Sequence, residues 1–336
     1  MNDRPNPATQ PSDLAARVLA GDRRALARAI TMIESTRADH RREAEDLLSR
    51  LLPATGRSIR LGISGAPGVG KSTFIESFGQ HVIEQGHRIA VLAVDPSSRV
   101  SGGSILGDKT RMAELARQEQ AFIRPSPAGD SLGGVARRTR ETLLACEAAG
   151  FDVVVVETVG VGQSETAVAD MVDMFILLLM PGGGDDLQGI KRGIVELADL
   201  LLVNKADGDL AAAAGRTAAE YRNALRLLRP ASAAWTPQVL QCSGLTGADM
   251  PEVWQAVEHY RAALSEHGEI ARRRATQARS WLRAELSDSL LAALKAHPEI
   301  ARRLPALEAE VAQGRVTPTT AARTLLSAFL GEEKAP

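Results

Sequence analysis

Seven short apolar runs lie along the middle of the chain, and each ends in a polar or glycine-rich turn. Apolar runs of about four to eight residues are typical of strands that are buried on both faces, as in a parallel sheet between two helix layers. Longer segments with helical spacing separate the runs, so the pattern predicts an α/β fold. The strands are expected near residues 59–64, 88–94, 121–124, 152–157, 173–180, 199–203 and 238–242.

Two helical patterns precede the strand region. Asp22 can cap the first helix, and Pro53 ends the second. We expect them to form an N-terminal helical appendage at residues 13–56, after a disordered tail at residues 1–12. The apolar residues at helical spacing are Leu26, Ala29, Ile30 and Ile33 in the first helix and Leu47, Leu48, Leu51 and Leu52 in the second.

Helices replace strands again after about residue 265. One helical pattern ends at Pro298, and Thr317 caps a last helix. Such helices cannot bury an apolar face alone, so they must pack on the α/β domain or on a second subunit. We therefore expect an α/β domain at residues 57–265 and a C-terminal helical arm at residues 266–336. The apolar stripe of this arm contains Ala278, Trp281, Leu282, Leu286, Leu290 and Leu294.

Composition narrows the possible functions. The 336 residues carry a formal net charge of −1 and only 3% aromatic residues, which disfavours a nucleic-acid or anionic lipid partner. No apolar run is long enough for a membrane helix, and the polar N-terminus has no secretory pattern. Cys146 and Cys242 are far apart and form no metal motif. A cytoplasmic protein is expected.

The stretch GAPGVGKS follows the first strand and opens a helix. It matches G-x-x-x-x-G-K-[ST], the phosphate-binding loop, or P-loop, whose backbone N–H groups surround a triphosphate. Lys71 is expected to reach the β- and γ-phosphates, and the Ser72 hydroxyl to bind Mg²⁺. The predicted phosphate-binding residues are Gly65, Ala66, Pro67, Gly68, Val69, Gly70, Lys71, Ser72 and Thr73.

The expected base pocket lies at the tips of two later strands. The sixth run ends in NKAD, in which the Asp207 carboxylate can accept two hydrogen bonds from guanine N1 and N2. Asn204 can brace the neighbouring loops, and the stem of Lys205 can cover the purine. CSGLTG ends the last strand and would complete the pocket through Ser243, Gly244 and Leu245. This combination predicts that GTP and GDP are the ligands.

Three carboxylates are candidates for action near the γ-phosphate. Glu157 in ETVGVGQSE stands where many GTPases carry an aspartate, so it can hold Mg²⁺ or orient the attacking water; it can also simply cap the next turn. Asp95 and Asp108 are expected near the same sheet edge, where either could be an outer-sphere magnesium ligand; Asp108 could equally be a plain helix cap. The predicted catalytic residues are Lys71, Glu157, Asp95 and Asp108, and the predicted metal ligands are Ser72, Asp95 and Glu157.

The apolar run MFILLLM leads into PGGGDDLQGIK. Glycines give this loop backbone freedom, while Asp185, Asp186 and Lys191 can change partners when the γ-phosphate is lost. The pattern indicates a nucleotide-responsive switch loop, although a flexible turn before a helix has the same composition. Three consecutive arginines, Arg272 to Arg274, are interpreted as a solvated helix face rather than a catalytic patch.

Only a helix-length segment separates the P-loop from the next strand, which indicates a parallel crossover and not the hairpin arrangement of Ras-like proteins. With this order, the motifs between Gly65 and Gly247 resemble those of the MeaB/ArgK family of P-loop GTPases. The motifs that carry the resemblance are GAPGVGKSTF, AVDPSS, GGSILGDKTRM, RPSPAGDSLGGVA, ETVGVGQSE, PGGGDDLQGIK and NKAD.

The resemblance implies a Mg²⁺-dependent GTPase that acts as a chaperone of an adenosylcobalamin-dependent acyl-CoA mutase of the methylmalonyl-CoA mutase type. Such proteins gate cofactor loading, protect or reactivate the mutase, and form homodimers through their C-terminal helices. Three alternatives remain open: a metal-insertion GTPase, an ArgK-type kinase of transport proteins, and a passive GTP-binding scaffold.

Overall fold

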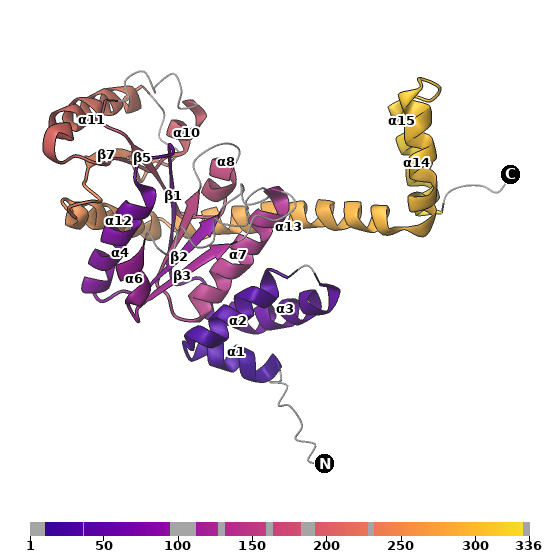
Figure 1. Cartoon of the computed structure of the whole chain (residues 1–336), viewed down its shortest axis with the longest axis horizontal. Coiled ribbons are helices and arrows are strands. Elements are labelled where there is room, and N and C mark those ends of the chain that lie inside the picture. The colour runs from indigo at the N-terminus through magenta and orange to yellow at the C-terminus, as the bar shows by residue number, and fades with distance from the viewer. Residues whose placement is uncertain are drawn as a thin grey trace, which may run out of the picture. The chain divides into compact units, whose positions relative to one another are not determined.

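The structure, a computed structural model, describes residues 11–35, 37–94, 112–126, 132–158, 164–182, 192–227 and 232–331. Within these residues, the seven apolar runs form one sheet in the order β3-β2-β4-β1-β5-β6-β7, and every recorded strand pair is parallel (Figure 1). The strands are β1 (Ile59–Gly65), β2 (Ile89–Val94), β3 (Ala121–Ser126), β4 (Val153–Thr158), β5 (Met174–Leu179), β6 (Leu200–Val203) and β7 (Gln238–Gln241). The predicted α/β fold and its parallel crossover are confirmed.

Helices cover both faces of the sheet (Figure 1). On one face α4, which follows the P-loop, packs against α12 and α6; on the other, α7 and α8 lie together. The fit of α8 is close, because a Cβ at Gly62 in β1 would lie 2.9 Å from a methyl carbon of Val168. These helices are α4 (Lys71–Glu84), α6 (Ala113–Arg117), α7 (Leu132–Ala148), α8 (Ser164–Ala169), α10 (Arg192–Leu197), α11 (Ala211–Leu225) and α12 (Met250–Glu266), with 3₁₀ turns η1 (Leu52–Ala54) and η2 (Gly208–Leu210).

The N-terminal appendage contains α1 (Pro11–Leu19), α2 (Arg23–Ile33) and α3 (Ala38–Leu51), all packed on α7. The predicted cap is present, since the Asp22 carboxylate accepts from the backbone of Arg24 at 2.8 Å and of Ala25 at 3.1 Å. The sequence prediction missed α1 and is wrong for residues 11 and 12, which begin this helix. The helix forms there because Leu14, Ala15 and Val18 are buried. Residues 1–10 lie outside the described part.

The chain divides into two compact units, residues 1–277 and 278–336. The long helix α13 (Glu269–Ala296) begins in the first unit, so the first turns of the predicted C-terminal arm belong with the α/β domain. In the second unit α14 (Pro298–Ala312) packs against α15 (Pro318–Leu330), and the rings of His297 and Phe329 lie 5.5 Å apart. Thr317 caps α15 as predicted, accepting from the backbone of Thr320 at 3.2 Å.

Ion pairs fix the start of α13 to the amino edge of the sheet. Arg274 donates to both carboxylate oxygens of Asp173, at 2.7 and 2.5 Å, and Arg273 lies 3.3 Å from the Asp199 carboxylate. The interpretation of the three arginines as a solvated face is therefore wrong for these two and fits only Arg272, whose side chain is 70% exposed. Asp173 and Asp199 stand just before β5 and β6, where they also accept from backbone N–H groups.

Candidate nucleotide site

The P-loop has the backbone shape that its glycines permit. Gly65 has φ +155°, and a Cβ there would lie 2.6 Å from the Leu178 carbonyl oxygen in β5. Gly70 has φ +92°, and a Cβ there would lie 2.9 Å from the Asn204 amide nitrogen. Larger residues at these positions would displace the loop from the sheet or from the base-side loop. The glycines thus let the chain turn tightly between β1 and α4.

Lys71 is held inside this loop. Its Nζ donates to the carbonyl oxygens of Gly65 at 2.8 Å and Ala66 at 3.3 Å, and the residue is 9% exposed. Burial lowers the pKa of Lys71, and the negative charges of Glu157 and Glu165 oppose that shift. A buried cation whose hydrogen-bond partners are neutral carbonyls can exchange them for phosphate oxygens, which carry negative charge.

Ser72 and Glu157 meet next to the P-loop. The Ser72 hydroxyl lies 3.2 Å from a carboxylate oxygen of Glu157, which is 7% exposed near the end of β4. Hydroxyl and carboxylate oxygens are the hard ligands that Mg²⁺ prefers, so this pair fits the predicted metal position. The third predicted ligand, Asp95, lies outside the described residues, as does Asp108.

Asn204 connects the P-loop with two base-side loops. Its amide nitrogen donates to the Val69 carbonyl at 2.9 Å, and its amide oxygen accepts from the backbone of Gly244 at 2.9 Å. Lys205, with φ +58°, extends its Nζ to the Gly68 carbonyl at 2.7 Å. Three loops from distant parts of the chain therefore have one fixed arrangement, as expected for the bracing role of Asn204.

Asp207 faces the last loop of the site. One of its carboxylate oxygens accepts from the Ser243 hydroxyl at 2.6 Å, and the Ser243 oxygen accepts from the Thr246 backbone at 3.1 Å. Leu245, by contrast, is 77% exposed. These hydrogen bonds orient the carboxylate that is predicted to recognise guanine.

A model of the family described as methylmalonyl-CoA mutase-associated GTPase MeaB matches residues 26–299. The chain belongs to this family. A putative GTPase of Caulobacter vibrioides is 58% identical over 96% of this chain and 99% of its own length. The methylmalonic aciduria type A homolog of Mus musculus is 49% identical over 93% of this chain and 78% of its own length. A crystal structure described as LAO/AO transport system kinase has 39% identity and a TM-score of 0.75, covering 98% of this chain and 99% of that one.

Membership of the MeaB family defines the basic activity. The protein is a GTP hydrolase with a P-loop NTPase fold, and it binds guanine nucleotide. None of the described helices combines the length and the apolar character that crossing a bilayer requires.

Sequence reasoning overlooked two residues beside the MeaB-type site. The Ser77 hydroxyl in α4 donates to the Gly244 carbonyl at 2.6 Å, and a Cβ at Gly244 would lie 2.8 Å from the Phe74 backbone nitrogen, so the last loop lies directly on α4. No local signal distinguishes Ser77 from any polar residue within a helix. Glu165 is buried at the start of α8; its only signal is its place in ETVGVGQSE.

The predicted switch residues Asp185, Asp186 and Lys191 lie outside the described part of the chain. Just before them, Gly182 donates its backbone N–H to the Thr217 hydroxyl at 3.1 Å. The assignment of a switch loop therefore stays a prediction.

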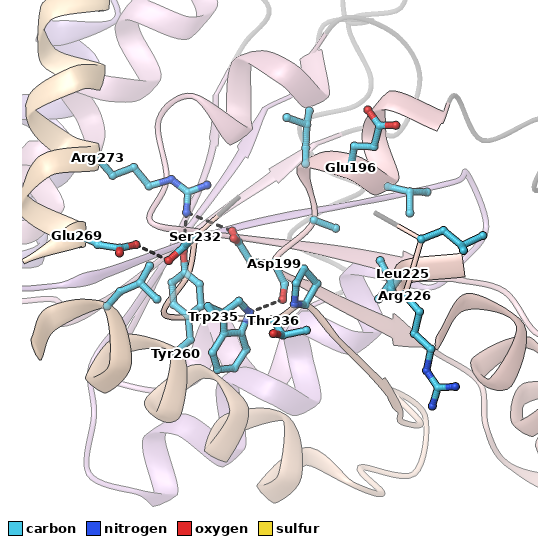
Figure 2. Close-up of a pocket in the computed structure, with 16 residues that line it drawn as sticks. Glu196, Asp199, Leu225, Arg226, Ser232, Trp235, Thr236, Tyr260, Glu269 and Arg273 are labelled. Carbon is cyan, nitrogen blue, oxygen red and sulfur yellow. Dashed lines mark hydrogen bonds and ion pairs between the residues drawn. The ribbon is translucent and has the colours of Figure 1, made fainter. Parts of the chain in front are cut away.

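A cavity of about 770 Å³ lies at the opposite, amino edge of the sheet. Figure 2 shows Trp235 and Tyr260 beside it, with Arg273 directed toward Asp199 and Ser232 toward Glu269. Four of its polar side chains are thus paired with one another, Arg273 with Asp199 and Ser232 with Glu269. The cavity is also remote from the motifs, which end the strands at the other edge, so the nucleotide site is assigned from the motifs and not from cavity size.

Proposed function

We propose that the protein is a Mg²⁺-dependent GTPase that acts as the chaperone of an adenosylcobalamin-dependent acyl-CoA mutase of the methylmalonyl-CoA mutase type. Its GTP cycle would gate cofactor loading and protect or reactivate the mutase. The observation that carries this proposal is the match of residues 26–299 to a family described as methylmalonyl-CoA mutase-associated. The name of the 49% identical mouse relative, which refers to methylmalonic aciduria, supports the same partner. We propose that this takes place in the cytoplasm.

Each site residue would have its own role in binding and hydrolysis. Lys71 would move its Nζ from the loop carbonyls to the β- and γ-phosphate oxygens and neutralise their charge. Ser72 and Glu157 would hold Mg²⁺, which supplies further neutralisation of the charge that develops on the phosphates. Asp207, oriented by Ser243, would accept from guanine.

Basal hydrolysis should be slow because no arginine of the described site is placed to stabilise the transition state, and such a group is worth about 10³–10⁵ in rate. We expect a mutase partner to order the loops and accelerate turnover. Phosphate release by the purified protein, measured with and without mutase, tests this. Fast hydrolysis by the isolated protein, or no change on adding mutase, would contradict a partner-gated cycle.

The loop from Pro181 to Lys191 is proposed as the element that communicates the nucleotide state. Replacing Asp185, Asp186 and Lys191 together with alanine should leave GTP affinity within about threefold, because the P-loop and Asp207 are untouched. Acceleration by the mutase should be lost, since a ligand shifts a two-state loop only through interactions that differ between the states. Nucleotide titration and stimulated turnover of the triple variant would decide, and intact stimulation would reduce this loop to a surface turn.

We also propose that the second unit mediates homodimerisation. In α13, Leu282, Leu286 and Leu290 are 69%, 57% and 54% exposed, a stripe that a second copy can cover. A protein that ends at Gln277 keeps Arg273 and Arg274 in the first unit and should be monomeric in sedimentation, with GTP binding retained. A monomeric full-length protein would contradict the proposal.

The alternative of a transport-protein kinase follows from the description of the solved relative as an LAO/AO transport system kinase. A kinase moves the γ-phosphoryl group to a protein, whereas the proposed chaperone releases it as phosphate. Labelled GTP incubated with candidate binding proteins distinguishes the two by the fate of the label. Metal content after purification tests the metal-insertion alternative, and measurable turnover excludes a passive scaffold.

A further inference from the structure

The loop at residues 243–247, which follows β7, lies directly on α4 at Gly244. The Gly244 N–H donates to the Asn204 amide oxygen at 2.9 Å, and the Gly244 carbonyl accepts from the Ser77 hydroxyl at 2.6 Å. A Cβ at Gly244 would lie only 2.8 Å from the backbone nitrogen of Phe74. Both backbone polar groups of Gly244 are thus bound by side chains from outside the loop, and the helix leaves no space there for a methyl group.

Ser77 uses its hydroxyl differently from two other helical serines, Ser49 and Ser287. A serine within a helix commonly donates to the carbonyl four residues earlier. Ser49 donates in this way to Glu45 at 2.8 Å, and Ser287 to Arg283 at 3.0 Å. Ser77 instead donates to a loop that lies 167 residues later in the chain. Its hydroxyl therefore attaches α4 to that loop and does not serve its own helix.

The same loop orients the carboxylate that is predicted to recognise guanine. Ser243 precedes Gly244 in the chain, and the Ser243 hydroxyl donates to Asp207 at 2.6 Å. The helix α4 begins at Lys71, directly after the P-loop, so it carries phosphate-binding residues at its start and holds the loop further along. The position of Asp207 relative to the P-loop therefore depends in part on where Gly244 lies on α4.

We propose that Ser77 is a positioning residue for guanine recognition, which fixes the 243–247 loop on α4 so that the base and the phosphates of one nucleotide are bound together. Without its hydroxyl, the Gly244 peptide keeps the bond to Asn204, about which the loop can turn. Groups that bind one ligand at two places must be held at the right separation, so such a rotation weakens binding of the base. The proposal rests on the proposed role of Asp207 and does not depend on the mutase.

The test is Ser77→Ala, with GTP hydrolysis and nucleotide binding measured on the full chain. The KM for GTP and the Kd of labelled GDP should rise by about three- to tenfold, the effect of one lost hydrogen bond. The kcat should stay within about twofold, because Lys71 and Ser72 keep their places. The Kd of ATP, measured by displacement of labelled GDP, should change less than about twofold, because adenine has no donor pair for Asp207. The preference for GTP over ATP should therefore fall.

Three further variants check the cause. Ser77→Thr retains the hydroxyl and should return the KM to within about twofold of the parent. Gln80→Ala removes a polar side chain from the next turn of α4, where its amide donates to Glu76 of the same helix at 3.3 Å, and should change neither KM nor kcat. Gly244→Ala alters the other side of the contact, since its methyl group must displace the loop from α4. It should raise the KM at least as much as Ser77→Ala does.

An unchanged preference of Ser77→Ala for GTP over ATP contradicts the proposal. Equal weakening of both nucleotides, or a lower kcat at unchanged KM, contradicts it as well, because Ser77 would then support the P-loop helix and not the base-side loop. A parent protein with no preference for GTP overturns the role of Asp207, and the proposal with it. Thermal unfolding without nucleotide shows whether each variant folds, and Gly244→Ala provides the same comparison if Ser77→Ala does not.

Discussion

At the amino edge of the sheet, charged side chains bond one another. Arg274 is paired with Asp173 at 2.5 Å, and Arg60 with Glu147 at 2.8 Å, with both members of each pair largely buried. At the carboxyl edge, the buried Lys71 donates instead to carbonyls of its own loop, and Glu157 contacts the hydroxyl of Ser72. The buried charges named at the amino edge are thus paired with opposite charges, whereas those at the carboxyl edge contact neutral groups.

The difference separates stability from function. The charges of a buried ion pair neutralise each other, so they are not available to a ligand. Removing one partner leaves the other charge unpaired in the protein interior, which costs free energy of folding. Burial raises the pKa of Asp199, against the opposing effect of Arg273, which illustrates that cost. An ammonium group that is hydrogen-bonded to neutral carbonyls, as in Lys71, can move to phosphate oxygens at a much smaller cost in free energy. We therefore expect changes at the amino edge to affect folding and changes at the carboxyl edge to affect nucleotide chemistry.

Lys71→Ala should have the largest effect. It removes the charge that faces the phosphates, so hydrolysis should fall at least about 10²–10³-fold, the loss typical when one transition-state donor is removed. The free energy of unfolding should change little, because burying the charged Lys71 ammonium group itself costs free energy. Phosphate release and urea unfolding measure the two effects. If the variant unfolds much more easily than the parent, Lys71 belongs with the structural charges and the contrast between the edges fails.

Asp173→Ala tests the amino edge. It leaves Arg274 without its carboxylate partner and removes the acceptor of the Arg60 backbone N–H, so the free energy of unfolding should fall by about 3–5 kcal/mol. The remaining folded molecules should bind GTP within about twofold of the parent. Urea unfolding and nucleotide titration at low temperature provide the comparison. Loss of GTP affinity at unchanged stability would mean that this edge is part of the nucleotide site.

These pairs also mark what sequence alone could predict. The strands were predictable because each is a continuous apolar run, such as MFILLL in β5, and this signal is local. The nucleotide motifs were predictable because they stand where strands end. Arg274 and Arg273 were not, since their partners lie 101 and 74 residues earlier and only the folded chain brings them together. Glu165 was not predicted as a residue beside the site, because an acidic residue in the first turn of a helix is common and carries no further signal.

Asp207→Asn should have an intermediate effect, confined to base recognition. An amide cannot accept both guanine hydrogen bonds, so GTP affinity should fall by about 10- to 100-fold, and xanthosine triphosphate should become the better ligand. The Ser243 hydroxyl can still donate to the new amide oxygen, so the loop should keep its position. Titrations with both nucleotides measure the change. Equal affinity of the parent for ATP and GTP would overturn the assignment of Asp207.

Arg272→Ala should have the smallest effect, and it is the matched control for the amino edge. Arg272 stands two residues before Arg274 on the same helix and has the same charge, but its side chain is 70% exposed, against 16% for Arg274. Its pair with Glu269 spans 3.8 Å at the surface, where such pairs contribute about 0–1 kcal/mol.

Arg272→Ala should therefore change the free energy of unfolding by less than about 0.5 kcal/mol, whereas Arg274→Ala should cost several kcal/mol because it leaves Asp173 buried and unpaired. Urea unfolding of the two variants side by side compares a buried arginine, which also donates to the carbonyls of Gly56 and Ser58, with an exposed one on the same helix. Equal losses would show that the helix start, rather than its buried ion pairs, stabilises this edge of the sheet.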